Sequence, residues 1–136
     1  MTSLLKEVIN TGTARKAKRL KREDIAGKTG TTNELVDAWF AGFNPDVVTI
    51  TWMGYDQPRS LGKHESGSRA ALPIWIDYMK PIINDYPNRI VETPEGIIPL
   101  RINPKNGMLT NKDEDGIYEY FYDEFPPSNN AYFLLN

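Results

Sequence analysis

Apolar residues recur at helical spacing near the start of the chain and again in its middle. Over residues 1–10, four apolar side chains lie three or four positions apart and predict a helix: Leu4, Leu5, Val8 and Ile9. Gly12 follows this helix and is suited to a left-handed C-cap. A second helix is predicted over residues 68–83, where the apolar positions are Ala70, Ala71, Ile74, Trp75, Tyr78, Met79 and Ile82.

Between these helices the pattern changes to short runs rich in β-branched and aromatic residues. Such runs favour strands, here predicted over residues 23–32, 37–43 and 47–55. Because the connections between them are short, the strands are expected to form an antiparallel sheet. Trp39 and Trp52 are large aromatic residues and are predicted to lie in the core. The predicted fold class is α+β, an antiparallel sheet flanked by helices.

The pattern weakens after residue 86, which divides the chain into a first part, 1–86, and a C-terminal extension, 87–136. Prolines punctuate the extension, and short β-like pieces occur at residues 97–103 and 116–121. Asn106-Gly107 is typical of a turn. Both a small appended β element and a largely extended tail agree with this sequence, which offers no chemical task for the extension.

Composition narrows the possible functions only slightly. The chain has 136 residues, a formal net charge of −2 and no cysteine. Nucleic acid is therefore not an expected partner, and neither disulfides nor thiolate chemistry are available. No apolar run approaches the length of a membrane span. The chain begins within a predicted helix, which suggests that it is the C-terminal piece of a longer polypeptide.

A basic run occupies residues 15–22 and allows two interpretations. The simpler one is a solvated connection that precedes the sheet. The other is a contact with an anion, such as a lipid head group or a glycan-bound stem peptide. No aromatic residue interrupts the run, which weakens the case for nucleic-acid binding.

The strongest candidate for chemistry is the stretch Gly27-Lys28-Thr29-Gly30-Thr31-Thr32. On a strand, side chains alternate between faces, so Lys28 and Gly30 share one face while Thr29 and Thr31 share the other. A strand edge also presents backbone N–H groups to a ligand laid beside it. Together these groups would receive an extended peptide with a free carboxylate.

Two other interpretations of this stretch compete. Gly27-Lys28-Thr29 matches the end of a phosphate-binding P-loop, but Arg22 stands where that motif needs its first glycine, and no helix is predicted to follow. The stretch is also compatible with a simple glycine turn between two strands.

The context of the stretch resembles the penicillin-binding transpeptidases, for which Lys-Thr-Gly is a characteristic element. The resemblance extends over Asp24–Asn33, then Asp37-Ala38-Trp39-Phe40-Ala41-Gly42-Phe43, then Val48–Asp56 with its Trp-Met-Gly-Tyr-Asp end. It is similar above all to bifunctional, class A members of the 1A type. It covers residues 1–79 and implies the C-terminal part of a fold shared with serine β-lactamases.

The resemblance implies serine acyl transfer on D-Ala-D-Ala stem peptides, with β-lactams as further ligands and with no cofactor or metal ion. Lys28 and Thr31 would be catalytic, and Lys28, Thr29, Gly30 and Thr31 would bind substrate. The hydroxyl groups of Thr29 and Thr31 would bind the substrate carboxylate, and the Thr31 N–H would supply half of the oxyanion hole. Gly30 would keep the strand face clear for the ligand backbone.

Two further strings match family motifs, but their positions argue against catalytic roles. Ser3-Leu4-Leu5-Lys6 fits Ser-x-x-Lys, and Ser128-Asn129-Asn130 fits Ser-x-Asn. In the family, the nucleophile lies far upstream of Lys-Thr-Gly and the relay serine lies between them. The nucleophile is therefore expected outside this chain, which alone should be inactive. His64 is expected to be a solvated loop residue, because the family uses no catalytic histidine.

The resemblance also implies a parent protein with an upstream glycosyltransferase domain, anchored in the inner membrane with its catalytic domains on the periplasmic side. The membrane is a partner only through that missing anchor. Two alternatives remain open: a soluble serine β-lactamase, and a non-catalytic peptidoglycan-binding module that has lost its nucleophile.

Overall fold

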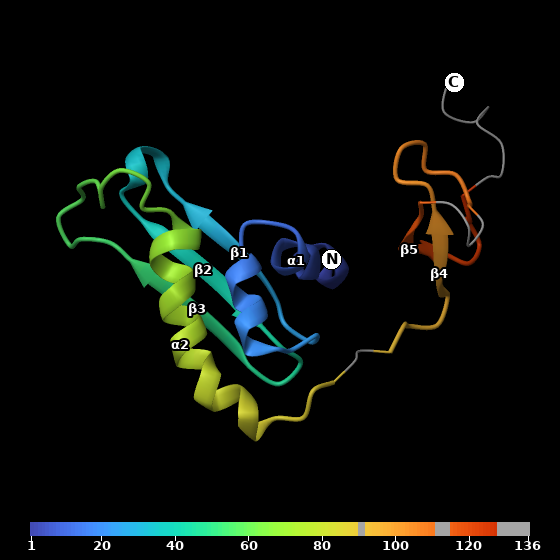
Figure 1. Cartoon of the computed structure of the whole chain (residues 1–136), viewed down its shortest axis with the longest axis horizontal. Helices are drawn as coiled ribbons and strands as arrows, with labels where there is room; N and C mark the ends of the chain where they lie inside the picture. Colours follow the sequence, from blue (N-terminus) through green and yellow to red (C-terminus); the bar gives the residue numbers. More distant parts are fainter. Residues whose placement is uncertain (90–91, 111–114, 128–136) are drawn as a thin grey trace. The chain divides into compact units, whose positions relative to one another are not determined.

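The computed structural model describes residues 1–89, 92–110 and 115–127, and the chain divides into two compact units, Met1–Val91 and Glu92–Asn136 (Figure 1). The first unit contains α1 (Thr2–Asn10), the 3₁₀ helix η1 (Arg15–Leu20), β1 (Ala26–Thr31), η2 (Asn33–Leu35), β2 (Ala38–Phe43), β3 (Val48–Met53), the π-helical turn η3 (Gly67–Ala71), α2 (Leu72–Ile82) and η4 (Ile83–Asp85). The second unit contains β4 (Ile97–Ile102) and β5 (Ile117–Tyr122).

The first unit is built on a three-stranded antiparallel sheet in the order β1-β2-β3, which confirms the predicted arrangement. In its register, Gly30 pairs with Trp39, and Trp39 in turn pairs with Trp52. The turn between β2 and β3 is closed by the Asn44 side chain, whose Oδ1 accepts hydrogen bonds from the N–H groups of Asp46 at 3.2 Å and Val47 at 2.8 Å. An asparagine is favoured there because its side chain can imitate a backbone turn.

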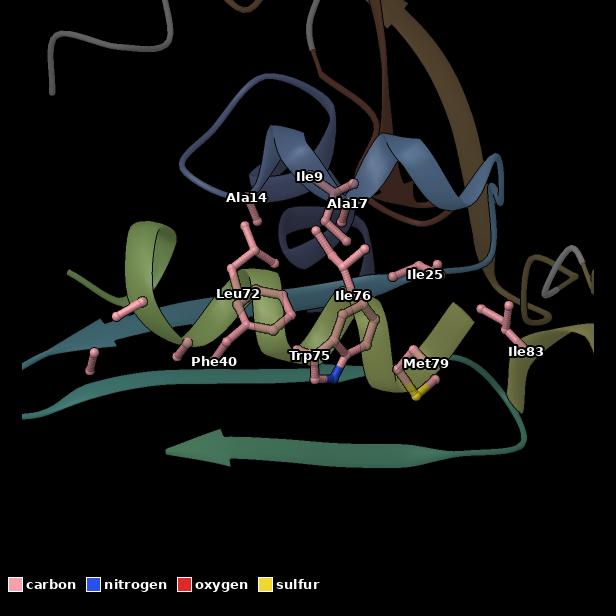
Figure 2. Close-up of a cluster of buried hydrophobic side chains, with 13 residues drawn as sticks. Ile9, Ala14, Ala17, Ile25, Phe40, Leu72, Trp75, Ile76, Met79 and Ile83 are labelled. Atoms are coloured by element: carbon pink, nitrogen blue, oxygen red, sulfur yellow. The ribbon is translucent and has the colours of Figure 1, made fainter. Parts of the chain in front are cut away.

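One face of this sheet, which we call the covered face, packs against α2 and includes Ala38, Phe40 and Thr49. Figure 2 shows Phe40 of this face beside Leu72 and Trp75 of α2. The ring of Trp75 from α2 meets that of Phe40 edge-on, with centroids 5.0 Å apart, and its Nε1–H donates to the Thr49 carbonyl oxygen at 3.1 Å. Both aromatic side chains are fully buried. Figure 2 also shows Ile9 of α1 and Ala17 of η1 on the other side of Leu72 and Ile76, so all three helices contribute to one core.

The opposite face, which we call the open face, carries Trp39, Ala41, Val48, Ile50 and Trp52. The prediction that Trp39 and Trp52 lie in the core is wrong: they are 41% and 45% exposed. The physical reason is strand alternation, which turns Trp39 away from α2 once its neighbour Phe40 is buried. The two indole rings lie 6.1 Å apart, and Trp52 Nε1–H donates to Asp37 Oδ1 at 2.9 Å.

The predicted second helix forms as η3, α2 and η4 in succession, but its buried face differs in part from the prediction. Leu72, Trp75, Ile76 and Met79 are buried, whereas Ile74 and Tyr78 are exposed. Pro73 lies in the first turn of α2, where a proline is tolerated.

The first helix forms as predicted, but the expected left-handed cap at Gly12 does not. Gly12 is absent from the residues with positive φ among those described. It lies instead against the last turn of α1, where a Cβ would stand 2.8 Å from Val8 Cα and 2.9 Å from the Val8 carbonyl oxygen. The glycine therefore provides a close approach of two backbones rather than a special torsion angle.

The basic run at residues 15–22 is not uniformly solvated, because Arg22 forms what we call the Arg22 clamp. Its guanidinium donates to both carboxylate oxygens of Asp24, at 2.9 and 2.6 Å. It also donates to the carbonyl oxygens of Ile83, Tyr86 and Pro87. Arg89 N–H completes the clamp with a 3.2 Å bond to Asp24 Oδ2. The clamp ties the segment after α2 to the start of β1.

Electrostatics within the clamp favour the charged form of both partners. Burial raises the pKa of Asp24, but hydrogen bonds from Arg22 and from the Arg89 N–H outweigh it and leave that pKa below its ordinary value. The hydrogen bond to Asp24 in turn raises the pKa of Arg22.

The second unit is an antiparallel pair in which Ile97 faces Tyr122 and Ile102 faces Ile117. A small β element therefore forms in the extension, one of the two possibilities that the sequence left open. Its turn region includes Gly107, which has a φ of +70° and donates to the Asn103 carbonyl oxygen at 2.8 Å. Ser128-Asn129-Asn130 lies outside the described residues. Within the described ranges, the structure has no helix with the length and apolarity needed to cross a bilayer.

Candidate active-site strand

The Lys-Thr-Gly stretch lies within β1, at an edge of the three-stranded sheet. It therefore forms neither a P-loop nor a turn, because the strand runs through Lys28, Thr29 and Gly30 and pairs with β2 throughout. Gly27 is needed just before it, since a Cβ there would stand 2.7 Å from Phe40 Cζ and 2.8 Å from the Ala41 carbonyl oxygen. Edge strands offer backbone groups to an extended ligand.

The two faces of β1 carry different groups. Lys28 and Gly30 pair with Ala41 and Trp39 and so belong to the open face. Lys28 is exposed, and its Nζ donates to the carbonyl oxygen of Thr29 at 2.8 Å. This bond folds the ammonium group back onto the strand that carries it, where it adds positive charge beside the motif.

Thr29 and Thr31 belong to the covered face, because they pair with the buried residues Phe40 and Ala38. The helices leave both threonines partly or fully accessible, and among the described residues each hydroxyl has one hydrogen-bonding partner. Thr29 Oγ1 lies 2.8 Å from Thr13 Oγ1. Thr31 Oγ1 accepts a hydrogen bond from the Gly67 N–H at 3.0 Å.

Gly67 reaches this position because it has no side chain. A Cβ there would stand 2.4 Å from the Trp39 carbonyl oxygen and 2.5 Å from that of Gly30. The first residue of η3 thus lies directly against the paired backbones of β1 and β2, and only glycine can approach them so closely. The position holds the N–H of Gly67 on the hydroxyl of Thr31.

Sequence patterns did not identify Thr13 or Gly67 as neighbours of the motif. Thr13 lies in the turn between α1 and η1, and Gly67 follows a polar loop. Neither position carries a local signal, because each contact depends on how a distant segment packs against β1. The four predicted residues, Lys28, Thr29, Gly30 and Thr31, are consecutive, so the strand itself brings them together.

Comparison with known proteins identifies the group to which the chain belongs. It is 50% identical over 96% of its length to penicillin-binding protein 1A of Pseudomonas aeruginosa, and 53% identical over 84% of its length to penicillin-binding protein 1A of Aquifex aeolicus. A crystal structure of penicillin-binding protein 1A from Haemophilus influenzae superposes with a TM-score of 0.84, at 38% identity and over 93% of this chain. The chain belongs to the penicillin-binding protein 1A family.

The chain represents only a part of such a protein. It spans 16% of the length of each of the two relatives and 20% of the chain in the Haemophilus influenzae structure. No protein-family model matches it. The α+β architecture with antiparallel strands and flanking helices is that of the penicillin-binding protein 1A structure over the region shared.

The other candidate residues of this penicillin-binding protein 1A segment lie outside the Lys-Thr-Gly strand. His64 is exposed and has a φ of +70° in the loop before η3. Ser3 and Lys6 both lie in α1, and Lys6 lines a cavity of about 630 Å³ together with Lys18, Lys21 and Arg22. None of Lys28, Thr29, Gly30 and Thr31 lines that cavity. Within the described ranges, no cluster of three or more acidic or histidine side chains is arranged to hold a metal ion.

Proposed function

We propose that the chain contributes the Lys-Thr-Gly strand to a serine-type D-Ala-D-Ala transpeptidase that cross-links peptidoglycan and is acylated by β-lactams. The observation that carries the proposal is the edge position of β1, which presents Lys28 and two threonine hydroxyls along one extended segment. Membership of the penicillin-binding protein 1A family supports the choice of substrate.

In this proposal, Lys28, Thr29 and Thr31 act together on the bound substrate. An extended stem peptide lies along the free edge of β1 and pairs with its backbone. Lys28 supplies positive potential for the substrate carboxylate and for the relay serine, while Thr29 and Thr31 donate hydrogen bonds to that carboxylate. The N–H of Thr31 contributes to the oxyanion hole, where loss of one donor typically costs about 2.7–4 kcal/mol of transition-state stabilisation.

The nucleophile and its lysine are supplied by residues upstream of this chain, so the chain alone turns over no substrate. The whole protein carries a glycosyltransferase domain and acts at the periplasmic side of the inner membrane, held by an anchor outside this chain. A serine β-lactamase would use a similar strand, but no observation on this chain favours that activity. The high identity to penicillin-binding protein 1A favours the transpeptidase.

The test is acylation of the full-length protein by benzylpenicillin, followed by intact mass and peptide mapping. We expect a stable adduct on a serine outside these 136 residues. Lys28→Met should lower the second-order acylation rate constant by about 100-fold or more, the effect typical for loss of one preorganised electrostatic group. Lys80→Met, at an exposed position of α2, is the matched control and should leave the rate unchanged.

Three outcomes would contradict the proposal. An adduct on Ser3 would place the nucleophile within this chain. Rapid turnover of benzylpenicillin in place of a stable adduct would indicate a β-lactamase. A full-length protein that forms no adduct would be a binding module without transpeptidase activity.

A further inference from the structure

The hydroxyl of Thr13 lies 2.8 Å from that of Thr29, although the two residues are 16 positions apart. Thr13 belongs to the turn between α1 and η1, a segment with no assigned role in the chemistry. Its side chain is exposed and the contact lies at the surface. The pair is therefore accessible to a ligand that reaches Thr29.

The backbone around Thr13 is held on both sides, which fixes its hydroxyl relative to β1. Gly12 N–H donates to the Glu7 carbonyl oxygen at 3.0 Å, and Ala14 N–H donates to the Val8 carbonyl oxygen at 3.0 Å. Ala14 is also fully buried in the core beneath the turn. A group held by bonded neighbours on both sides is preorganised and loses little entropy when a ligand binds.

Proton counting gives the direction of the Thr13–Thr29 hydrogen bond in the bound state. A hydroxyl has one proton to donate and two lone pairs with which to accept. When Thr29 donates its proton to a carboxylate, it has none left for Thr13, so Thr13 must donate to Thr29. The resulting chain runs from Thr13 through Thr29 to the anion, and each bond polarises the next.

Thr31 offers an internal comparison. Its partner is the Gly67 N–H, which can only donate, so the Thr31 proton is already free for a ligand. As long as its bond to Thr13 is kept, Thr29 reaches the same state only when Thr13 acts as donor. The two hydroxyls of the motif are therefore set by two different segments, the turn before η1 and the start of η3.

We propose that Thr13 is a positioning residue for carboxylate recognition by β1: its hydroxyl donates to Thr29 Oγ1 and directs the Thr29 proton toward the ligand carboxylate. The inference rests on the proposed function, because it assumes that Thr29 meets that carboxylate. In this role Thr13 acts through Thr29 rather than on the reacting carbonyl, so we expect its effect on binding and not on the acylation step.

The experiment compares benzylpenicillin with its methyl ester as acylating agents of the full-length protein. Time courses at several concentrations separate the dissociation constant of the initial complex from the acylation rate constant. For Thr13→Val we expect the dissociation constant for benzylpenicillin to rise about 3- to 10-fold, as for loss of one hydrogen bond in an ionic chain. The acylation rate constant should stay within about 2-fold, and so should both constants for the ester, which lacks the charge.

Two further variants separate positioning from structural damage. Thr13→Ser keeps the hydroxyl and should restore the constants to within about 2-fold of wild type. Thr11→Val removes a hydroxyl of the same turn that, within the described part of the chain, bonds to Glu7 at 3.2 and 3.4 Å. This variant should leave the ratio of the dissociation constants for the acid and the ester unchanged. Thermal unfolding of all three variants accompanies the kinetics.

If Thr13→Val weakened the binding of acid and ester equally, or of neither, the role of Thr13 would be overturned. The proposed transpeptidase function would be unaffected by that result. Failure of Thr13→Ser to rescue would overturn it as well. If the wild-type protein forms no adduct, the proposed function fails, and the inference fails with it.

Discussion

The tryptophans on the two faces of the three-stranded sheet differ in how deeply they are buried. On the covered face, Trp75 of α2 packs against Phe40 and is fully buried. On the open face, Trp39 and Trp52 pack against each other but keep much of their surface exposed. One strand, β2, supplies residues to both faces, since Trp39 and Phe40 are neighbours in sequence. The comparison shows that the residue type does not decide burial; the position of α2 does.

The same division applies to the candidate site. Lys28 and Gly30 lie on the open face, whereas Thr29 and Thr31 lie on the covered face beside the segments that hold their hydroxyls. Packing on the covered face therefore fixes the hydroxyls that, in the proposed function, would meet the carboxylate. Lys28, which would act there through its charge, lies on the other face.

The largest effect should come from removing the aromatic centre of the covered face. Trp75→Ala deletes a fully buried side chain and its hydrogen bond to Thr49, and should lower the free energy of unfolding by about 3–5 kcal/mol. Urea-induced unfolding of the chain, followed by circular dichroism, measures the change. Trp75→Phe keeps most of the ring contacts and should cost clearly less. A loss below about 1 kcal/mol for Trp75→Ala would contradict its place in the core.

The next effect concerns the Arg22 clamp, which attaches the segment after α2 to the segment before β1. Asp24→Asn leaves Arg22 without its anionic partner and should cost about 3 kcal/mol at neutral pH. Because the pKa of Asp24 is lowered on folding, its stabilisation is fully present above its unfolded pKa of about 3.9. That stabilisation is lost as the pH falls through the lower pKa of the folded state.

Urea unfolding at several pH values tests this sign. The difference in stability between wild type and Asp24→Asn should be constant above about pH 5 and shrink as the pH falls below about 4. Asp77→Asn, at an exposed position on α2, serves as the control and should change stability little at any pH. A difference that grew on acidification would show that Asp24 is not stabilised as an anion.

The smallest effect should appear on the open face. Trp52→Phe keeps an aromatic ring beside Trp39 but removes the 2.9 Å hydrogen bond to Asp37, and should cost about 1 kcal/mol or less. The same unfolding experiment measures it. A cost as large as that of Trp75→Ala would show that the open face is tightly packed in the protein, and the contrast between the two faces would disappear.

Much of the sheet could be predicted from the sequence, because short strands with short turns allow few arrangements. The antiparallel order and the alternation of Lys28, Thr29, Gly30 and Thr31 followed from this local pattern. The burial of Trp39 and Trp52 did not, since it depends on which face α2 covers. Gly12 shows a similar limit: the sequence predicts a left-handed cap there, whereas the structure has a close approach to Val8.

The motif residues of the candidate site could be proposed from the sequence because they are consecutive and chemically distinctive. Their partners were not, because Thr13 and Gly67 reach β1 from segments 16 and 36 positions away from the threonines they contact. The two interpretations of the basic run, a solvated connection and a contact with an external anion, did not include the carboxylate of Asp24, although the guanidinium of Arg22 binds both of its oxygens. Such contacts require knowledge of the packed chain.

The Arg22 clamp has a consequence for the order in which the chain folds. Its contacts with Ile83, Tyr86 and Pro87 join residues 61, 64 and 65 positions apart. Closing so long a loop costs entropy before its bonds can form, so we expect these contacts to form late in folding. The strand that carries Lys28 is therefore anchored at its start only when the segment beyond α2 arrives. During synthesis, that segment leaves the ribosome well after the strand itself.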